Sequence, residues 1–180
     1  MGNASDHYPV LLILAAFSRH DDALRWARER TSEAWGDLAL SSEVFPFEYT
    51  QYYEPAMGTG LKKVLLAYQR LIDPTRLVDL KHQTNDWEDE YHRIADHPEA
   101  RPLNLDPGYV TQAKLVLATT KDRDHRIYLG RGIFAEVTLH FQRGRGWIPR
   151  EWTYADYRSQ GYHDFLTRCR AYLRGRNRAE

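Results

Sequence analysis

One apolar run near the start of the 180-residue chain places the strongest constraint on its fold. The segment PVLLILAAF, residues 9–17, contains no polar side chain and is bounded by polar residues. A strand that is buried on one face alternates apolar and polar residues, whereas a continuous apolar run indicates burial on both faces. We therefore expect residues 9–17 to form a central strand of a sheet.

Capping residues define the first helix. Ser18 followed by Asp21 matches a capping box, in which a hydroxyl and a carboxylate satisfy the free amides at a helix start. Gly36 supplies the stop. These signals predict a helix over residues 19–35.

The second helix has the clearest start in the chain. Asp73 is suited to the N-cap and Pro74 to the first helical position. The preceding run, residues 64–72, keeps the parity of a strand. Residues 38–49 are expected to form a further strand, which Pro46 either restricts to an edge or interrupts in its regular pairing. The apolar stripe of this helix is Leu77, Leu80, Thr84, Trp87, Tyr91 and Ile94. Its opposite, polar face carries Lys81, His82, Asn85, Glu88, Asp89 and His92.

The second half of the chain is expected to contain a hairpin and a terminal helix. Residues 125–129 and 133–142 alternate on either side of a glycine turn, with the odd positions from 133 to 141 on the core face and Ile127 and Leu129 joining them. Residues 111–121 fit helix or strand, with the helix favoured. The terminal helix buries Cys169, and we expect a frayed tail over residues 170–180.

These elements predict one α+β domain, residues 1–180, with a mixed or mainly antiparallel sheet of about five strands and three to four helices. The 25 basic residues equal the 25 acidic ones, so no overall field attracts nucleic acid or a membrane. The single cysteine excludes an internal disulfide, and no basic segment precedes the short apolar run. A cytoplasmic protein without membrane contact is the expectation, and the oligomeric state stays open.

Polar residues of the hairpin and of residues 106–121 are the main candidates for a site. Arg126 and Glu136 share one parity in the predicted hairpin, where they form either a solvated ion pair or a ligand-facing surface. If residues 111–121 are helical, Lys114 and Lys121 lie on one stripe, as an anion would require. If they form a strand, the two lysines point to opposite sides.

A glycine turn offers a second, weaker anion site. Gly58 and Gly60, with Lys62 or Lys63, lie in the segment MGTGLKK, which lacks the spacing and the hydroxyl of a phosphate-binding P-loop. On the second helix, His82 and His92 have acidic neighbours at metal-ligand spacing but no third ligand in register. The sequence therefore assigns no metal site, and it identifies no cofactor.

Several longer segments resemble a known family. They are FPFEYTQYYEPAMGTGLKK, RLIDPTRLVDLK, LNLDPGYVTQAKLVLATTKDRDHRIYLGRGIFAEVTL and WTYADYRS. Together they are similar to an uncharacterised bacterial family, the domain of unknown function 4416, over nearly the whole chain. The resemblance implies no reaction. Some members carry the label "GTP-binding protein", but here Arg123 stands where the guanine-reading pattern requires Asp.

The resulting functional hypothesis is a binding site for a small anionic or phosphorylated ligand, with a nucleotide as one candidate. Its ligand-binding residues would be Lys114, Lys121, Arg126, Gly58, Gly60 and Lys62. Its candidates for proton transfer would be His125, Glu136 and Asp106, although the sequence does not decide whether the protein is an enzyme. The alternative is a non-catalytic interaction module that contacts RNA or a protein partner through the Tyr, Trp and Arg side chains of WTYADYR and the terminal helix, with nucleic acid the less favoured partner.

Overall fold

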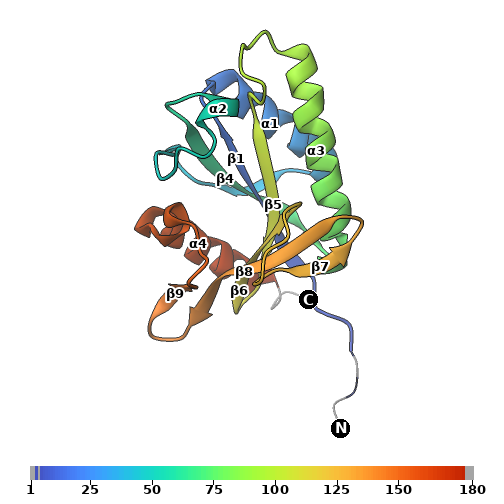
Figure 1. Cartoon of the computed structure of the whole chain (residues 1–180). Helices are drawn as coiled ribbons and strands as arrows, with labels where there is room; N and C mark the ends of the chain where they lie inside the picture. The colour runs from blue at the N-terminus through green and yellow to red at the C-terminus, as the bar shows by residue number, and fades with distance from the viewer. Residues whose placement is uncertain (1–2, 4, 177–180) are drawn as a thin grey trace.

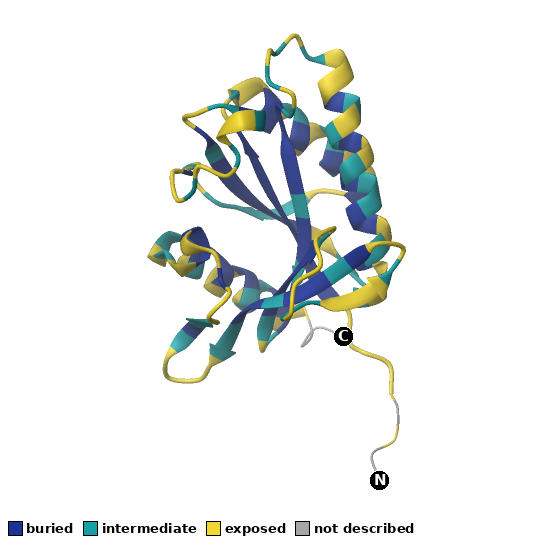
Figure 2. Ribbon diagram, viewed as in Figure 1, coloured by how far each residue is buried: buried dark blue, intermediate teal, exposed yellow. Residues whose placement is uncertain are grey.

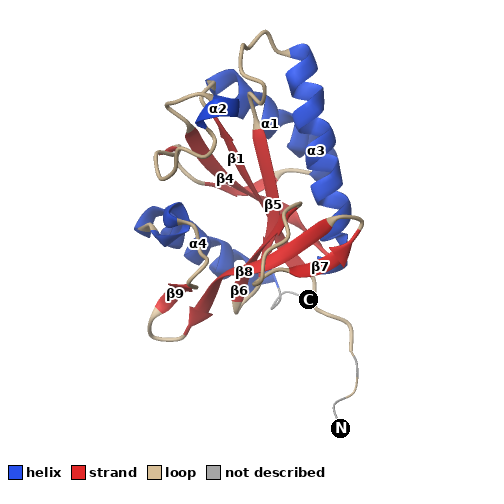
Figure 3. Ribbon diagram, viewed as in Figure 1, coloured by secondary structure: helices blue, strands red, loops and turns tan. Residues whose placement is uncertain are grey.

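A computed structural model describes residue 3 and residues 5–176 of the chain. Its strands are β1 (Val10–Ser18), β2 (Leu38–Ser41), β3 (Phe45–Pro46), β4 (Lys62–Ile72), β5 (Asn104–Val110), β6 (Lys114–Thr119), β7 (Ile127–Gly130), β8 (Ile133–Gln142) and β9 (Gly146–Pro149). Its α-helices are α1 (Asp21–Trp35), α2 (Glu54–Met57), α3 (Leu77–Ile94) and α4 (Gln160–Arg176), with 3-10 turns η1 (Pro74–Arg76) and η2 (Ala155–Arg158). The order of the elements along the chain can be followed in Figure 1, and the alternation of helix and strand in Figure 3.

The nine strands form one open sheet in which every pairing is antiparallel. The order across the sheet is β2-β4-β1-β5-β6-β8-β7, with β3 added to β4 and β9 added to β8. The predicted α+β class and helix number are confirmed, whereas the prediction of about five strands is wrong. Four of the nine strands are only two to four residues long, too short to show a periodic pattern in the sequence.

The apolar run at the start of the chain is the central strand β1, as expected, and every residue of it is buried. Leu12, Leu14 and Ala16 pack in one cluster with residues of α1 and α3. Leu11 and Ile13 pack in a second cluster with α4, on the opposite face of the sheet. Helices therefore cover both faces of β1, which is the dark blue centre of Figure 2.

The start of α3 follows its sequence signals, but the start of α1 does not. The carboxylate of Asp73 accepts a hydrogen bond from the Thr75 backbone N–H at 2.8 Å, and η1 leads directly into α3. The capping box predicted for α1 is absent, because the Ser18 hydroxyl accepts from the His20 backbone N–H at 3.0 Å and not from that of Asp21, while it donates to the Pro102 carbonyl at 2.6 Å. Asp21 is bound by Lys62 at 2.7 Å. Both residues of the predicted box therefore have partners far away in the sequence.

The helix favoured for residues 111–121 is wrong, because this segment is a tight turn followed by β6. The Thr111 hydroxyl accepts from the backbone N–H groups of Ala113 and Lys114, at 3.0 Å each. Leu115 and Leu117 then face the α4 side of the sheet, while Val116 packs against the start of α3. Both faces of β6 are buried, so the sequence shows no polar alternation that would identify a strand.

The hairpin of β7 and β8 also differs from the expectation. Ile127 and Leu129 lie on an edge strand and are 70% and 42% exposed instead of entering the core. In β8 a register shift opposite Leu115 and Val116 interrupts the alternation. Odd positions up to Val137 therefore pack on the α3 side, whereas Leu139 packs on the α4 side.

At the C-terminus, α4 packs Tyr162, Phe165 and Cys169 onto the sheet, so Cys169 is buried as the sequence predicts. The Cys169 thiol is fully buried, and burial raises its pKa to about 12. The helix continues to Arg176 with Leu173 buried, through the start of the stretch expected to be frayed. Residues 177–180 lie outside the described residues.

The sheet opens between its two halves. β5 pairs with β1 along its whole length, but it pairs with β6 only over Gly108–Val110. Pairing with β6 ends beside Pro107, which has no backbone N–H to donate to a ladder. In Figure 1, β5 rises away from β6 and β8. The resulting opening between β5 and β6 places polar side chains where a continuous sheet would hold only core.

Candidate functional site

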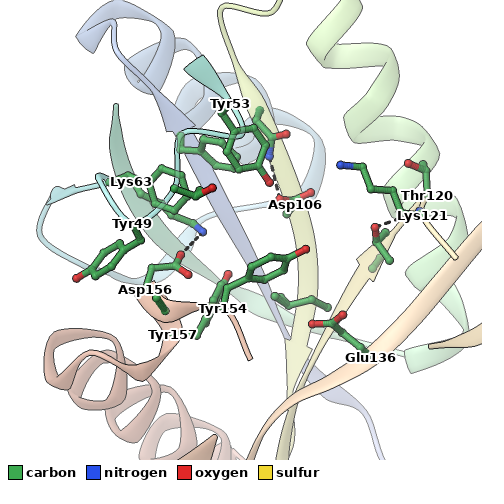
Figure 4. A pocket seen from close by; sticks show the side chains of 18 of the residues that line it. Tyr49, Tyr53, Lys63, Asp106, Thr120, Lys121, Glu136, Tyr154, Asp156 and Tyr157 are labelled. Atoms are coloured by element: carbon green, nitrogen blue, oxygen red, sulfur yellow. Dashed lines mark hydrogen bonds and ion pairs between the residues drawn. The ribbon is translucent and has the colours of Figure 1, made fainter. Parts of the chain in front are cut away.

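A cavity of about 130 Å³ lies at the opening between β5 and β6 (Figure 4). Its floor is the face of the sheet on which α4 packs, and its rim is formed by the loop after β3 and by η2. Five basic and three acidic residues line it, namely Lys63, Lys81, Arg101, Lys121, Arg126, Asp106, Glu136 and Asp156. Four tyrosines also line it, namely Tyr49, Tyr53, Tyr154 and Tyr157. Such a density of charge inside a cavity is unusual, because charged groups are rarely buried unless they are paired.

Strand pairing explains why these side chains converge. Phe17 of β1 is the direct partner of Lys63 in β4 and of Asn104 in β5, so the three side chains form a row on one face. Leu117 of β6 and Glu136 of β8 form a second row across the opening. The two rows come from opposite halves of the sheet, and the cavity lies between them.

Lys63 and Asp156 form a buried ion pair at one side of the cavity. The Lys63 ammonium donates to the Asp156 carboxylate at 2.7 Å, and the two side chains are only 5% and 2% exposed. The ammonium also lies 4.7 to 5.9 Å from the ring centres of four aromatic residues. They are Phe17, Phe47, Tyr157 and Tyr162. A carboxylate and several ring faces together replace the hydration that this ammonium loses.

Asp106 lies at the opening and is held on both oxygens. The Lys81 ammonium, which reaches it from α3, donates to Oδ1 at 3.0 Å and to the Leu105 carbonyl at 2.9 Å. Asn104 donates to Oδ2 at 2.9 Å. Burial alone would raise the pKa of Asp106, but the Lys81 charge and these hydrogen bonds outweigh burial and lower it. The carboxyl is therefore ionised at neutral pH.

A second α3 residue anchors Arg101. The Glu88 carboxylate accepts from the Arg101 guanidinium at 2.7 and 3.1 Å and from the Leu105 backbone N–H at 2.7 Å. Burial raises the pKa of Glu88 in spite of the nearby Lys81 and Arg101 charges. Glu88 thus fixes the guanidinium of Arg101 at the cavity and joins α3 to β5.

Arg126, Glu136 and His125 meet on the other side of the opening. Arg126 Nε donates to Glu136 Oε2 at 2.8 Å, and the two side chains are 4% and 3% exposed. His125 Nε2 lies 3.2 Å from the same oxygen, and its ring stacks on Trp152 with 5.0 Å between centres. The ion pair is buried in the cavity wall, not solvated as a polar sheet face would be.

Lys121 is the most accessible cation of the site. Its ammonium donates to the Tyr52 hydroxyl at 2.6 Å and lies 4.2 Å from the centre of that ring. No carboxylate lies within ion-pair distance of it among the described residues. Lys121 therefore brings a positive charge to the cavity rim that no described acidic group neutralises.

The structure brings some of the residues identified in the sequence together and leaves others apart. Asp106, Lys121, Arg126 and Glu136 line the cavity, and His125 touches it through Glu136. The others lie elsewhere. Lys114 begins β6 opposite His140, and Lys62 pairs with Asp21. Gly58 and Gly60 have positive φ angles in the turn before β4, which accounts for both glycines without a ligand.

Lys81, Arg101 and Asp156 are site residues that the sequence reasoning missed. The sequence hypothesis also names Lys62 as a ligand-binding residue, whereas its neighbour Lys63 is the lysine that lines the cavity. Lys81 and Glu88 are seven residues apart beside the apolar stripe of α3, and this spacing could have marked them as a half-buried charged row. Nothing in the local sequence distinguishes Asp156 from a surface aspartate.

The architecture defines the class of protein: an α+β protein with an open antiparallel sheet and a charged cavity at an opening in that sheet. A family model described as "Domain of unknown function (DUF4416)" matches residues 8–172. The chain belongs to this family, as the resemblance in its sequence predicted. Neither a curated protein nor a solved structure matches the chain. Within the described residues, no helix is both long and apolar enough to cross a membrane.

Proposed function

We propose that the cavity between β5 and β6 binds a small anionic or phosphorylated ligand. The observation that carries this proposal is the convergence of five basic side chains and three acidic ones on one cavity. Most of these cations are held by carboxylates, so the walls of the site are preorganised. Preorganised donors bind an anion without the cost of ordering flexible side chains.

Lys121 and the two arginines are the donors best suited to the anion. Lys121 has no carboxylate partner among the described residues. Arg101 and Arg126 each use part of the guanidinium to bind a glutamate, and Arg126 also donates to the Lys121 carbonyl and the Tyr154 hydroxyl. A guanidinium carries five N–H donors, so neither arginine has used all of them. Their remaining donors favour a phosphate or a carboxylate, which Arg recognises in a planar, paired geometry.

The size of the cavity restricts the ligand. A closed cavity of about 150 Å³ holds a molecule the size of benzene, and this cavity measures about 130 Å³. It therefore accommodates a phosphate group, a small carboxylic acid or one aromatic ring, but not a complete nucleotide. A nucleotide would place one of its parts inside and extend over the exposed rings of Tyr49 and Tyr154 at the rim.

The arrangement supports binding better than catalysis by the carboxylates. Asp106 is ionised and receives hydrogen bonds on both oxygens, so it is a poor general acid at neutral pH. Glu136 is bound by Arg126 and His125. If a proton is transferred at this site, the His125 and Glu136 pair is the candidate for it.

Ligand binding can be tested by thermal unfolding with inorganic phosphate, nucleoside phosphates, sugar phosphates and small carboxylic acids. A ligand at 100 times its dissociation constant stabilises the protein by about 2.7 kcal/mol, which is roughly 5 to 10 °C for a chain of this size. Loss of a hydrogen bond to a charged group costs about 1.5 to 3 kcal/mol. We therefore expect Lys121→Ala to weaken binding about tenfold or more.

Lys114→Ala is the matched control, because Lys114 lies at the opposite end of β6 from the cavity. This variant should bind the ligand as the unmodified protein does. If none of the anions shifts the unfolding temperature of the unmodified protein, or if both lysine variants lose affinity equally, the cavity is not the anion site that we propose.

A second function, as an interaction module, is favoured by one observation. Ile127, Tyr128 and Leu129 of the edge strand β7 are exposed, as are Trp152 and Tyr154. An exposed apolar strand edge is suited to a protein partner. The arginines fit RNA less well, because Arg158 is bound to backbone carbonyls and Arg170 packs over Phe141. Concentration-dependent association in size-exclusion chromatography, abolished by Ile127→Lys, would support this alternative.

A further inference from the structure

A second group of chemically active side chains lies outside the cavity, where α1 begins. It consists of His20, Asp22 and His97, and one potential metal-ligating atom from each lies within 4.8 Å of the others. His20 directly precedes α1 and Asp22 is in its first turn, whereas His97 follows α3. No other such group of three converges among the described residues. The fold therefore assembles it from positions that are far apart in the sequence.

The spacing of two of the three ligand atoms is close to that of a metal coordination shell. His97 Nε2 and Asp22 Oδ2 are 3.1 Å apart. The Tyr91 hydroxyl lies 3.1 Å from the first and 3.2 Å from the second. Two ligands at about 2.1 Å from a tetrahedral ion lie roughly 3.4 Å apart. Asp22 and His97 could therefore bind one ion after side-chain shifts of a few tenths of an ångström.

The second histidine lies beside the first. The rings of His20 and His97 are stacked, with 3.7 Å between their centres and 11° between their planes, so one ring must rotate out of the stack when both bind a single ion. Glu99 lies 2.9 Å from Nε2 of His20, and Arg19 donates to Glu99 at 3.0 Å. A carboxylate that is itself held in place and binds the ring of a histidine is the usual outer shell of a metal site.

We propose that His20, Asp22 and His97 bind one divalent transition-metal ion, of which Zn²⁺ is the representative. Two imidazoles and a carboxylate are the donors that Zn²⁺, Co²⁺ and Fe²⁺ accept in proteins, whereas Mg²⁺ prefers oxygen ligands only. The histidine pairs of the polar face of α3 lack this convergence. His82 lies 3.1 Å from the Arg131 carbonyl, and His92 is exposed.

The ion would join two segments that support the cavity. His97 and Glu99 belong to the connection between α3 and β5, and the same connection carries Arg101. The Arg101 backbone N–H donates to the Ala56 carbonyl at 2.9 Å, and its guanidinium lines the cavity. A metal that ties His97 to the start of α1 therefore stabilises the segment that positions a cation of the anion site.

The test is metal titration of the full chain, free of any affinity tag and stripped with a chelator. Isothermal titration with Zn²⁺ should give one ion per chain, and Co²⁺ should give the visible absorption of a low-symmetry site. Mg²⁺ should give neither signal. His97→Ala and Asp22→Asn should each weaken Zn²⁺ binding by at least about tenfold.

His92→Ala is the control, because His92 is an exposed histidine of α3 outside the group. It should bind Zn²⁺ as the unmodified protein does. Should His97→Ala not fold, Asp22→Asn decides the question, because the Asp22 side chain is about half exposed. Absence of Zn²⁺ binding to the unmodified protein, or equal affinity of Asp22→Asn and the unmodified protein, would overturn the proposal.

Discussion

At the scale of single residues, the cavity depends on charges that the fold removes from water. Lys63 and Asp156 illustrate the rule, because each is almost fully buried and each has the other as its charged partner. Removing one partner of such a pair leaves an uncompensated buried charge, which costs more than the pair itself contributes. Neighbouring Lys62 makes the same kind of contact with Asp21 at the surface, where an ion pair contributes little.

We expect Lys63→Met to lower the free energy of unfolding by about 3 to 5 kcal/mol. Lys62→Met, one residue away, should lower it by less than about 1 kcal/mol. The double variant Lys63→Met, Asp156→Leu should recover part of the loss, because it leaves no buried charge alone. Urea unfolding of the four proteins measures these differences. Equal effects of the two lysine variants would contradict the account of the buried pair.

At the scale of elements, the site exists because β5 leaves β6 after three residue pairs. Gly108 is the first of the paired residues of β5, and its backbone lies very close to β6. An added Cβ would collide with the Val116 carbonyl oxygen and would lie 2.6 Å from Leu117 Cδ2. The glycine therefore permits the close approach that joins the two halves of the sheet just below the cavity.

Gly108→Ala is expected to destabilise the protein by about 1 to 3 kcal/mol, the range for added atoms in a packed interior. Gly175→Ala in α4 is the control, because nothing lies within 4 Å of an added Cβ there and alanine favours a helix. It should be neutral or stabilising. Denaturant unfolding gives both values, and unchanged stability of Gly108→Ala would refute the close approach.

At the scale of the whole molecule, helices on both faces of the sheet bury several ionisable hydroxyl groups. Tyr68 is fully buried and donates to the Thr31 hydroxyl at 2.7 Å. Burial raises its pKa above the ordinary value of 10.0, and burial also raises the pKa of Tyr53 and Tyr162. These groups ionise in the unfolded chain before they ionise in the native protein.

The sign of the pH dependence follows from this order. Between the unfolded and the native pKa, the native protein retains the proton and the unfolded chain loses it, so stability falls as pH rises above about 10. Each buried tyrosine contributes up to about 1.4 kcal/mol per pH unit. Tyr68→Phe should reduce the slope between pH 10 and 11 by up to that amount. Tyr8→Phe, at an exposed tyrosine, should leave this slope unchanged. Urea unfolding at each pH measures the stability of the three proteins.

The sequence by itself determined the elements whose signals are local. The apolar run of β1, the start of α3 at Asp73 and the burial of Cys169 in α4 depend on residues that are near neighbours along the chain. The sequence by itself also identifies the family, because the family model matches residues 8–172. Four of the candidate residues, from Asp106 to Glu136, also line the cavity.

Only the tertiary structure decided the partners of the polar groups. The Ser18 hydroxyl donates to the distant Pro102 carbonyl, and Lys81, expected on the solvated face of α3, donates to Asp106. The edge position of β7 exposed Ile127, and the opening beside Pro107 created the cavity. A desolvated charge or hydroxyl binds whichever group the fold brings near it, however far away in the sequence. Local periodicity does not carry that information.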